Sequence, residues 1–268
     1  MPTRWGVLAV SLALTVAACG AKRDPDLETR AIKAAVRPDE PAIVDSSPPP
    51  PAGGIATEEP EDKGSDRPIK RYSQAEIATI LGRVGGASGP LTATFATAVG
   101  TFSCELFESE APETVANFVG LATGALPWTA RAGGRTETGP YFDSLTFHRA
   151  IDAFMIQSGK RSPHFAGGPG WRLARETARN DAFDAPGALA MADDGDATHG
   201  SQYFITLKQD KSLSKRFAAF GVCTGLDIVR AIAAGEKRPA ASGSSASSPV
   251  APVKLERVTI SRGAAGLN

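Results

Sequence analysis

Apolar and polar residues alternate along two neighbouring stretches of the chain, residues 91–98 and 101–107. Phe95 and Phe102 are among the apolar members of these stretches. Alternation with a period of two places one set of side chains on a single face of a β-strand, where it can be buried. Gly100 separates the two stretches, and a glycine at this point permits a tight turn. The pattern therefore predicts a β-hairpin.

The spacing changes to that of helices in three other stretches. In residues 111–123, apolar side chains recur every three or four positions, and a proline lies in the first turn, where helices tolerate it. Residues 226–233 also predict a helix. Residues 73–82 begin with Ser73, and Glu76 follows three positions later, which is the form of a capping box. We expect this last helix to be short and to dock on the domain that follows it.

Short runs with strand-like composition occupy much of the remaining C-terminal part, at 146–147, 154–157, 188–191, 202–206, 218–222 and 254–261. Many short strands with two helices favour a mainly β fold over a parallel sheet of βαβ units. We expect a closed antiparallel β-barrel capped by two helices, spanning residues 91–264. Residues 71–90 would be a lead-in that carries the short helix. Residues 236–252 are rich in Ser, Ala and Pro and predict a loop.

The first 70 residues differ in composition from the rest. Residues 7–18 form an apolar run without a charge, and this run is too short to span a bilayer stably. Residues 1–18 therefore predict an export signal. Residues 19–70 are charged, rich in proline and poor in aromatic residues. Such a composition buries too little apolar surface to offset its ordering entropy, so we expect a disordered tether.

The apolar run ends in Val16-Ala17-Ala18-Cys19. This order of an aliphatic residue, two small residues and a cysteine resembles the lipobox of bacterial lipoproteins. The resemblance implies that Cys19 becomes the lipid-modified first residue and that its acyl chains anchor the protein to a membrane. Gly20 after the cysteine implies the outer membrane, with the protein facing the periplasm. The alternative is an ordinary cleaved signal with a chance cysteine.

Charge and cysteine usage narrow the possible partners. Lys+Arg and Asp+Glu both number 29, so no net charge attracts nucleic acid or an anionic membrane surface. Cys104 and Cys223 lie in apolar, strand-like stretches, which favours buried free thiols. An exported protein could instead pair them in a disulfide. Without a CxxC motif or a Cys/His cluster in the sequence, we expect no metal and no cofactor.

Four separated groups of residues resemble the signatures of the cyclophilin family, in the family's order. They are ELF at 105–107 with APETVANF at 111–118; YFD at 141–143 with FHR at 147–149 and FMIQ at 154–157; GGPGW at 167–171; and GALAMA at 187–192 with GSQYFIT at 200–206 and FG at 220–221. Together they cover residues 91–262, close to two thirds of the chain. The resemblance implies the cyclophilin fold and peptidyl-prolyl cis–trans isomerase activity on X–Pro bonds.

This activity needs little chemistry, but it needs a well-placed cation. Amide resonance sets a barrier of roughly 18–20 kcal/mol to rotation about the X–Pro bond, and no covalent intermediate is required to lower it. A cation that donates to the prolyl nitrogen stabilises the twisted state and not the planar one. The resemblance implies that Arg149 is this cation and that Gln157 anchors the substrate backbone.

The resemblance also implies which residues surround the substrate. Phe154, Met155, Phe204 and Leu213 would form the apolar pocket for the proline ring, Gln202 and Ala192 would line the peptide side of the groove, and Phe217 would cap the pocket. His148 stands beside Arg149, but adjacent strand residues face opposite ways, so we expect it to be structural. His164 and His199 are expected in loops, without a partner that would indicate a triad or a metal.

The chain departs from the family's pattern mainly on the far side of this groove. Ser212 stands where the family commonly has Trp, and Phe217 where it has His or Tyr; Phe165 replaces a Gly near the groove, Lys160-Arg161 replace Asp-Pro, and Asp193-Asp194 replace an Asn-Ala type pair. These changes favour a second hypothesis, a catalytically weak module that binds proline-containing peptides as a chaperone. A structural envelope lipoprotein with a vestigial fold is a third.

The leading hypothesis is an isomerase that assists the folding of exported proteins, because a pure peptide binder has no need of the cation at Arg149. Its partners would be proline-containing polypeptides and, through the lipid, a membrane. We expect it to act as a monomer.

Overall fold

The structure is a computed structural model, and it describes residues 67–86, 88–129, 134–161, 168–177, 181–193, 195, 197–239 and 247–263. The expected signal at 1–18, the expected lipid-modification site Cys19 and the expected tether as far as residue 66 lie outside these residues. Phe165, His164 and Asp194 lie outside them as well. In the part of the chain that is described, no helix has the length and apolar character needed to cross a bilayer.

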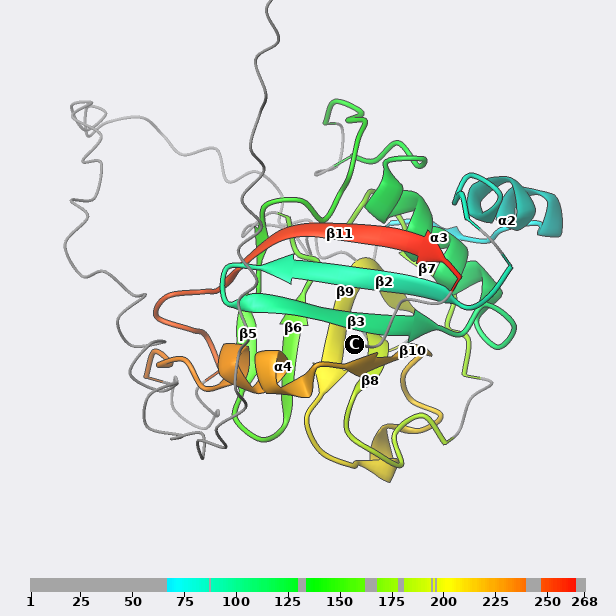
Figure 1. The fold of residues 1–268 in the computed structure, drawn as a ribbon. Coiled ribbons are helices and arrows are strands. Elements are labelled where there is room, and N and C mark those ends of the chain that lie inside the picture. The colour runs from blue at the N-terminus through cyan, green and yellow to red at the C-terminus, as the bar shows by residue number, and fades with distance from the viewer. Residues whose placement is uncertain are drawn as a thin grey trace, which may run out of the picture. The chain divides into compact units, whose positions relative to one another are not determined.

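The described residues form three α-helices, one short 3₁₀ helix and eleven strands (Figure 1). The helices are α2 (Gln74–Leu81), α3 (Pro112–Thr123), α4 (Leu226–Ala233) and the 3₁₀ helix η1 (Lys211–Leu213). The strands are β1 (Ile69–Lys70), β2 (Leu91–Thr97), β3 (Gly100–Leu106), β4 (Leu145–Thr146), β5 (Arg149–Ile151), β6 (Met155–Ser158), β7 (Arg172–Leu173), β8 (Ala188–Asp193), β9 (Thr198–Thr206), β10 (Ala219–Thr224) and β11 (Lys254–Arg262). The three expected helices and the expected hairpin, β2–β3, are confirmed.

All the strands belong to one sheet. Its order is β1-β7-β9-β8-β10-β3-β2-β11-β4, and β5 and β6 form a hairpin that attaches to β9. The strand pairs are antiparallel except β1 and β7, which run parallel. A mainly β fold is therefore confirmed. The expectation of a closed barrel is wrong, because no strand pairing among the described residues joins the two ends of the sheet.

The ladder stops at the bend between β4 and β5, which follow each other in the chain. β4 pairs with β11, whereas β5 pairs with β6. At the bend, the N–H of Phe147 donates to the carbonyl of Val253 at 3.0 Å, and the N–H of Ala150 donates to that of Ser247 at 2.8 Å. The covalent chain, and not a continuous ladder, thus connects β4 with the β5–β6 hairpin that carries part of the candidate site.

Aromatic rings fill the core between α3 and the sheet. Phe95 on β2 stacks on Phe102 on β3 with ring centroids 4.8 Å apart, and Phe118 on α3 packs edge-on against Tyr203 on β9 at 5.7 Å. Each of the four side chains is at most 2% exposed. Buried rings of this size are the largest single contributors of apolar area to a core. They fix α3 against β9, and successive side chains of β9 point to opposite faces, so its other face is free to serve the site.

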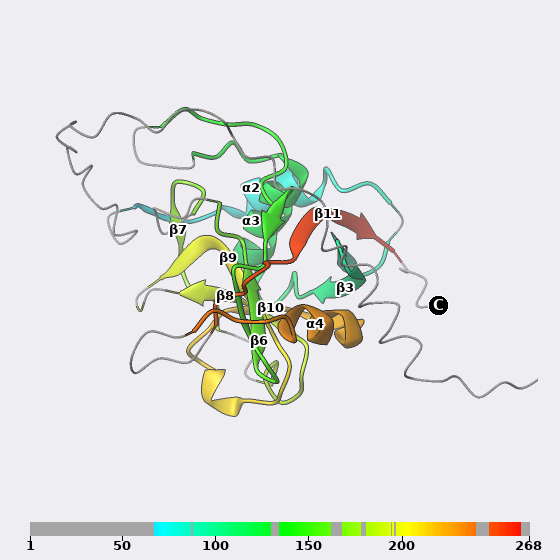
Figure 2. The same cartoon turned by 90° about the vertical axis from the view of Figure 1, so that its left-hand side faces the viewer.

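The helices sit at opposite ends of the sheet. α2 and α3 lie together at one end, and α4 lies at the other (Figures 1 and 2). The N-terminus of α3 receives a cap from far along the chain. Its N-cap residue, Ala111, offers no side-chain acceptor, and the carboxylate of Glu176 accepts hydrogen bonds from the N–H groups of Glu113 at 3.2 Å and Thr114 at 2.7 Å. The first N–H groups of a helix lack partners within the helix and favour negative charge, so Glu176 stabilises this end.

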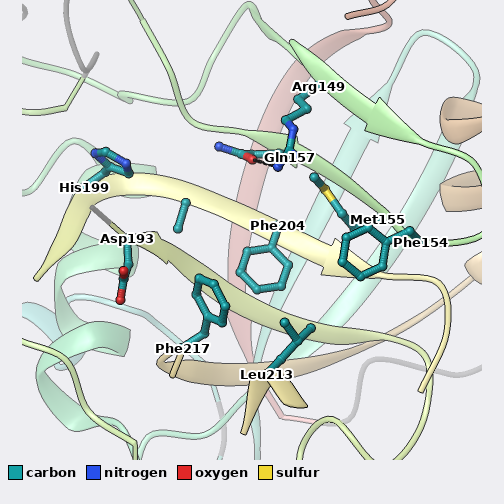
Figure 3. Close-up of a pocket in the computed structure, with 10 residues that line it drawn as sticks. Arg149, Phe154, Met155, Gln157, Asp193, His199, Phe204, Leu213 and Phe217 are labelled. Atoms are coloured by element: carbon teal, nitrogen blue, oxygen red, sulfur yellow. Dashed lines mark hydrogen bonds between the residues drawn. The ribbon is translucent and has the colours of Figure 1, made fainter. Parts of the chain in front are cut away.

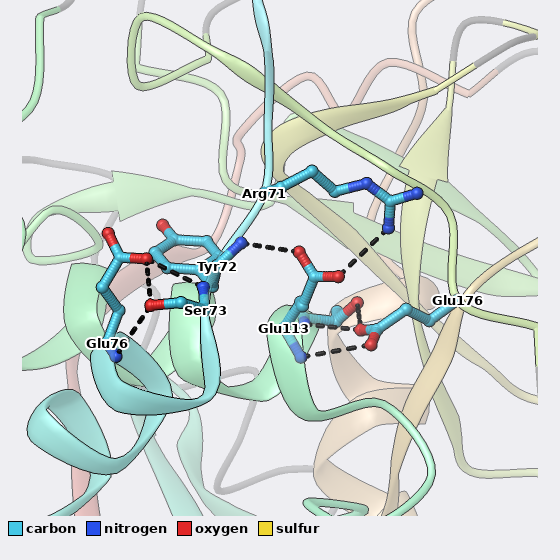
Figure 4. Close-up of polar contacts among 7 residues, drawn as sticks. Arg71, Tyr72, Ser73, Glu76, Glu113 and Glu176 are labelled. Atoms are coloured by element: carbon cyan, nitrogen blue, oxygen red, sulfur yellow. Dashed lines mark hydrogen bonds and ion pairs between the residues drawn. The ribbon is translucent and has the colours of Figure 1, made fainter.

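Polar contacts hold the lead-in segment against α3 (Figure 4). Ser73 and Glu76 form the expected capping box, with the N–H of Ser73 donating to the Glu76 carboxylate at 2.8 Å. The N–H of Tyr72 donates to the Glu113 carboxylate at 2.8 Å, and Arg71 pairs with the same carboxylate at 3.1 Å. The short helix is therefore docked on the domain, as expected.

The pairing of β1 with β7 was not expected from the sequence. Ile69 lies opposite Arg172, and Lys70 opposite Leu173. Strands of two residues are too short to show an alternating pattern, so nothing in the sequence marks them. The last residues of the segment that we expected to be a tether are therefore part of the sheet.

Cys104 and Cys223 form a disulfide. They lie directly opposite each other on β3 and β10, although 119 positions separate them in the sequence. The favoured expectation of free thiols is wrong because the strand register, which the sequence alone does not give, brings the two sulfur atoms together. The alternative, a disulfide between the two cysteines, agrees with the structure.

Candidate functional site

Three polar side chains lie in a row across the β5–β6–β9 part of the sheet. Arg149 and Gln157 are partners in the β5–β6 ladder, and an Nη of Arg149 donates to Oε1 of Gln157 at 3.4 Å. The amide nitrogen of Gln157 donates to Oε1 of Gln202 on β9 at 2.9 Å. The register of the two strand pairs thus aligns an arginine and two amides, and Arg149 and Gln157 lie at one edge of a cavity (Figure 3).

Alternation along β6 and β9 divides the side chains between the site and the core. Met155 and Gln157 point toward the cavity, whereas Ile156 between them belongs to the main core. On β9, Phe204 lines the cavity, whereas Tyr203 belongs to the aromatic core. This is the two-residue period that a strand imposes.

The cavity beside this row has a volume of about 280 Å³. We call it the main cavity; its lining is Arg149, Phe154, Met155, Gln157, Ala192, Asp193, His199, Phe204, Leu213 and Phe217 (Figure 3). Of the residues expected from the sequence, all but Gln202 line it. Gln202 is buried, and its Oε1 accepts a hydrogen bond from the side-chain amide of Gln157.

The apolar part of the main cavity consists of packed rings and aliphatic side chains. The rings of Phe204 and Phe217 meet edge to face, with centroids 5.1 Å apart. Phe183, which sequence reasoning did not single out, is 1% exposed and stacks on the other side of Phe204 at 6.4 Å. Phe183 therefore packs against Phe204, which lines the main cavity. It lies in the stretch before β8, and the sequence alone does not show that this stretch packs against β9.

The far wall of the main cavity comes from η1 and the turn after it. η1 contributes Leu213 and ends just before Ser214. Asp210 caps η1 by accepting from the N–H of Ser212 at 3.2 Å and from its hydroxyl at 2.6 Å. These hydrogen bonds lower the pKa of the Asp210 carboxyl. Ser212 is exposed and does not line the main cavity, so its hydroxyl serves the turn.

Asp193 and His199 line the main cavity although we had assigned them no role there. Asp193 ends β8 and pairs with Arg175 at 2.5 Å. His199 lies within β9, so the expectation that it belongs to a loop is wrong. β9 begins with polar residues, so it extends beyond the apolar stretch that predicts a strand. The start of β9 therefore could not be seen in the sequence.

The charge on Arg149 has no carboxylate partner within the described part of the chain. Partial burial lowers the pKa of its guanidinium, but an arginine side chain stays protonated at any physiological pH. The side chain is therefore a cation at the rim of an apolar cavity, with donors that a substrate can use.

His148, the neighbour of Arg149, is partly buried and does not line the main cavity. Burial first, and then the positive charges of Lys160 and Arg149, lower its pKa to about 4. The imidazole is therefore neutral at neutral pH. Among the described residues, no cluster of three or more His, Cys, Asp or Glu side chains could hold a metal ion.

Comparison with known proteins identifies the family. Residues 92–260 match the family model described as cyclophilin type peptidyl-prolyl cis-trans isomerase. The chain is 40% identical over 170 residues to peptidyl-prolyl cis-trans isomerase A of Mycobacterium tuberculosis, covering 63% of this chain and 92% of that protein. It is 39% identical over 152 residues to peptidyl-prolyl cis-trans isomerase B of Streptomyces anulatus, covering 56% of this chain and 87% of that protein.

A solved structure shows the same fold. The crystal structure of a cyclophilin type peptidyl-prolyl cis-trans isomerase from Cryptosporidium parvum aligns with a TM-score of 0.53 at 24% identity, over 65% of this chain and 99% of that one. The same protein in the presence of the dipeptide Ala-Pro aligns with a TM-score of 0.52. The chain belongs to the cyclophilin-type peptidyl-prolyl cis–trans isomerase family, and it is an enzyme that isomerises X–Pro bonds.

Proposed function

We propose that this isomerase acts on exported or envelope proteins, and that Arg149 supplies the catalytic charge. The proline ring of the substrate occupies the apolar part of the main cavity, between Met155, Phe204 and Leu213. The Arg149 guanidinium then donates a hydrogen bond to the prolyl nitrogen. That nitrogen accepts well only when rotation has taken its lone pair out of resonance, so the bond stabilises the twisted state selectively.

Gln157 completes this arrangement by holding the substrate backbone. Its carbonyl oxygen receives only a long hydrogen bond from Arg149, 3.4 Å, whereas its amide is fixed on Gln202 at 2.9 Å. The side chain is thus oriented from behind, and Arg149 is left free to turn to the substrate. The uncompensated cation at the rim of an apolar cavity is the observation that carries this mechanism.

The activity can be separated from plain peptide binding by two assays on the full chain. We expect it to accelerate the cis–trans exchange of a short X–Pro peptide and the slow, proline-limited refolding of an exported protein. A module that only binds proline-containing peptides would bind the same peptide without raising its exchange rate. Binding without acceleration in both assays would contradict the proposed mechanism.

We further propose that the protein is a monomeric lipoprotein of the bacterial envelope, anchored through Cys19 to the outer membrane and facing the periplasm. The Val16-Ala17-Ala18-Cys19 sequence after an apolar run supports the anchor. The disulfide between Cys104 and Cys223 supports an oxidising compartment, since reducing compartments keep thiols free.

Labelling tests the anchor directly. A labelled fatty acid supplied to the native host should enter the wild-type protein and not Cys19→Ala, and the variant should move from the membrane fraction to the soluble fraction. Cys19→Ser is a matched control of similar size and should behave like Cys19→Ala. Unchanged fractionation of both variants would contradict the anchor while leaving the isomerase assignment intact.

A further inference from the structure

A second cavity, of about 480 Å³, lies beside the bend between β4 and β5. We call it the basic cavity; its lining is Thr146, His148, Lys160, Arg161, Arg238, Ser248, Pro249 and Pro252. Three of these residues are cations and none has a carboxylate. Two of the departures from the family's pattern, Lys160 and Arg161, belong to this lining, so the basic cavity is made in part by residues that we found unusual in the sequence.

Hydrogen bonds tie the walls of the basic cavity to the strand that carries Arg149. The hydroxyl of Ser158 on β6 donates to the carbonyl of Thr146 at 2.9 Å. On the other side, the N–H of Ala150 donates to the carbonyl of Ser247 at 2.8 Å, and the N–H of Arg238 to that of Ser248 at 2.8 Å. The walls are therefore fixed to β4, β5 and β6.

Two consecutive residues of the chain line the basic cavity and the main cavity, one residue each. His148 lines the basic cavity, and the next residue, Arg149, lines the main cavity. Consecutive Cα atoms are about 3.8 Å apart. Since the two side chains face opposite ways, a polypeptide that lies across Arg149 has to pass around β5 to bring one of its side chains to the basic cavity.

The carboxylates of Asp143 and Glu137 act on the charge of Arg161, so the uncompensated positive charge of the basic cavity is that of Lys160 and Arg238. Arg161 is held by neutral acceptors, since its guanidinium donates to the carbonyls of Tyr141 and Asp143 and packs on the Trp128 ring at 4.7 Å. The Asp143 carboxylate pairs instead with Arg257 at 3.7 Å. Within the part of the chain that the structure describes, Lys160 and Arg238 have no ion-pair partner.

The adjoining sequence offers no carboxylate either. Residues 162–167 and 240–246, which follow Lys160-Arg161 and Arg238 in the chain and lie outside the described residues, contain no Asp or Glu. His148 adds an unmet polar group, because its Nδ1 is buried without a hydrogen-bond partner. A neutral imidazole offers one N–H donor and one acceptor nitrogen.

We propose that the basic cavity binds the acidic side chains of the polypeptides on which this enzyme acts. Lys160 and Arg238 would pair with a substrate carboxylate, and Arg161 would add a fixed guanidinium. The proposal rests on the proposed function, because it needs a substrate chain in the main cavity. An Asp or Glu that reaches the basic cavity then gains a contact that a neutral residue lacks. The ligand chemistry, an oxyanion, is shared with free phosphate, so the test must separate the two sources.

A peptide series on the full chain tests the proposal. Peptides with one X–Pro bond carry a single Asp at each of several positions on either side of the proline, and matched peptides carry Asn. Ion pairs near a surface change affinity by up to about fivefold each, so we expect kcat/KM to be about three- to tenfold higher for Asp than for Asn at one or two positions. The preference should shrink in about 0.5 M NaCl, where screening is strong.

Paired variants locate the effect. Lys160→Gln with Arg238→Gln should abolish the preference for Asp and leave turnover of the Asn peptides unchanged. Arg83→Gln with Arg230→Gln removes the same charge from exposed arginines outside the basic cavity and should keep the preference. If the enzyme turns over the Asn peptides but prefers Asp at no position, or if the preference survives in the Lys160/Arg238 variant, the proposal is wrong. Failure to turn over any peptide would instead refute the proposed function.

Two further arms separate other occupants. Inorganic phosphate should compete with the Asp peptides and not with the Asn peptides; binding of phosphate to an enzyme without an Asp preference would mean a free-anion site and would overturn the proposal. The chain's own acidic segment is removed by changing Glu58, Glu59, Glu61 and Asp62 to their amides. A preference for Asp that appears only in this variant would show that the segment, and not substrate, fills the basic cavity.

Discussion

One wall of the main cavity is made by paired strands and the opposite wall by a turn. On the strand wall, Arg149, Met155 and Phe204 each have a partner in an antiparallel ladder. On the turn wall, Leu213 and Phe217 lie on η1 and the residues after it, where Asp210 supplies the cap. The strand wall keeps the residue types that the family resemblance implies, whereas the turn wall has lost the Trp at Ser212.

The difference follows from how each wall is held. A ladder fixes every residue of a strand through its neighbours, so the position of a side chain there is set by the register of the whole sheet. A short 3₁₀ turn fixes few residues and tolerates exchange of its exposed ones. We therefore expect the strand wall to set the rate of isomerisation and the turn wall to set which ligands bind.

The largest effect should come from removing the charge on the strand wall. Arg149→Ala loses one charge-assisted hydrogen bond that forms mainly in the twisted state, worth about 1.5–3 kcal/mol. We expect kcat/KM for a short X–Pro peptide to fall by about tenfold to more than hundredfold, with an unchanged melting temperature. Arg216→Ala is the matched control on the turn wall, where the guanidinium lies 5.6 Å from the Phe217 ring. It should alter kcat/KM by no more than about threefold. Equal losses in the two variants would remove the distinction between the walls.

Ser212→Trp should raise the affinity for the cyclic peptide drug cyclosporin by more than an order of magnitude and change catalysis much less. In the family, the indole at this position packs on cyclosporin and donates a hydrogen bond to it. On the order of 100 Å² of apolar contact at about 25 cal/mol per Å² is worth about 2.5 kcal/mol. Wild-type enzyme should therefore be inhibited weakly, and Ser212→Trp much more strongly.

Ser212→Ala controls for loss of the hydroxyl that donates to the Asp210 carboxylate, and it should not gain affinity for cyclosporin. Inhibition of the wild type at nanomolar cyclosporin would mean that another side chain fills the place of the indole.

The sequence predicted the strand wall better than the turn wall for the same reason. Phe154 to Gln157 form a compact motif, so the motif fixes which residue of the family pattern each one matches. All but the core-facing Ile156 line the main cavity. Asp193 and His199 were missed because they lie where β8 and β9 lose register, at a bulge after Met191. Where a strand bulges, the alternation that predicts which side chain faces the site no longer holds.

Long-range pairings were the other limit of the sequence. The disulfide of Cys104 depends on the register between β3 and β10, and the open sheet depends on a change of partner at Phe147. The cap that Glu176 places on α3 also joins distant segments. Helix positions were predicted well because their signals are local: a capping box, a proline in the first turn and a stripe of apolar residues.

A smaller effect is expected at the ring of the turn wall. Phe217→Ala removes an edge-to-face contact with Phe204, worth about 0.5–1.5 kcal/mol beyond its buried area. We expect the ring to contact the substrate equally in the planar and twisted states, so KM should rise about two- to tenfold while kcat stays constant. Phe217→Tyr retains the ring and should restore KM. A fall in kcat with unchanged KM would place Phe217 with Arg149 as a residue that acts on the twisted state.

The smallest effect on catalysis is expected behind the strand wall, at His148. Its pKa is lowered to about 4, by burial first and then by the positive charges of Lys160 and Arg149, so the ring stays neutral through the physiological range. His148→Gln should therefore leave the pH profile of kcat/KM between about pH 6 and 8 unchanged. The residue acts on stability instead. Between about pH 6.5 and 4, His148 is protonated in the unfolded chain but stays neutral in the folded protein. The stability that depends on the neutral ring is therefore complete above about pH 6.5 and is lost as the pH falls towards 4.

That loss amounts to at most about 3 kcal/mol, and it is measured as the difference in urea unfolding between wild type and His148→Gln at pH 7 and at pH 4.5. The variant should lose less stability than the wild type on acidification, because it has no imidazole to charge. An acid limb in kcat/KM near pH 6 that disappears in His148→Gln would show that the ring titrates at the site, and the strand wall would then owe part of its charge to His148 as well as to Arg149.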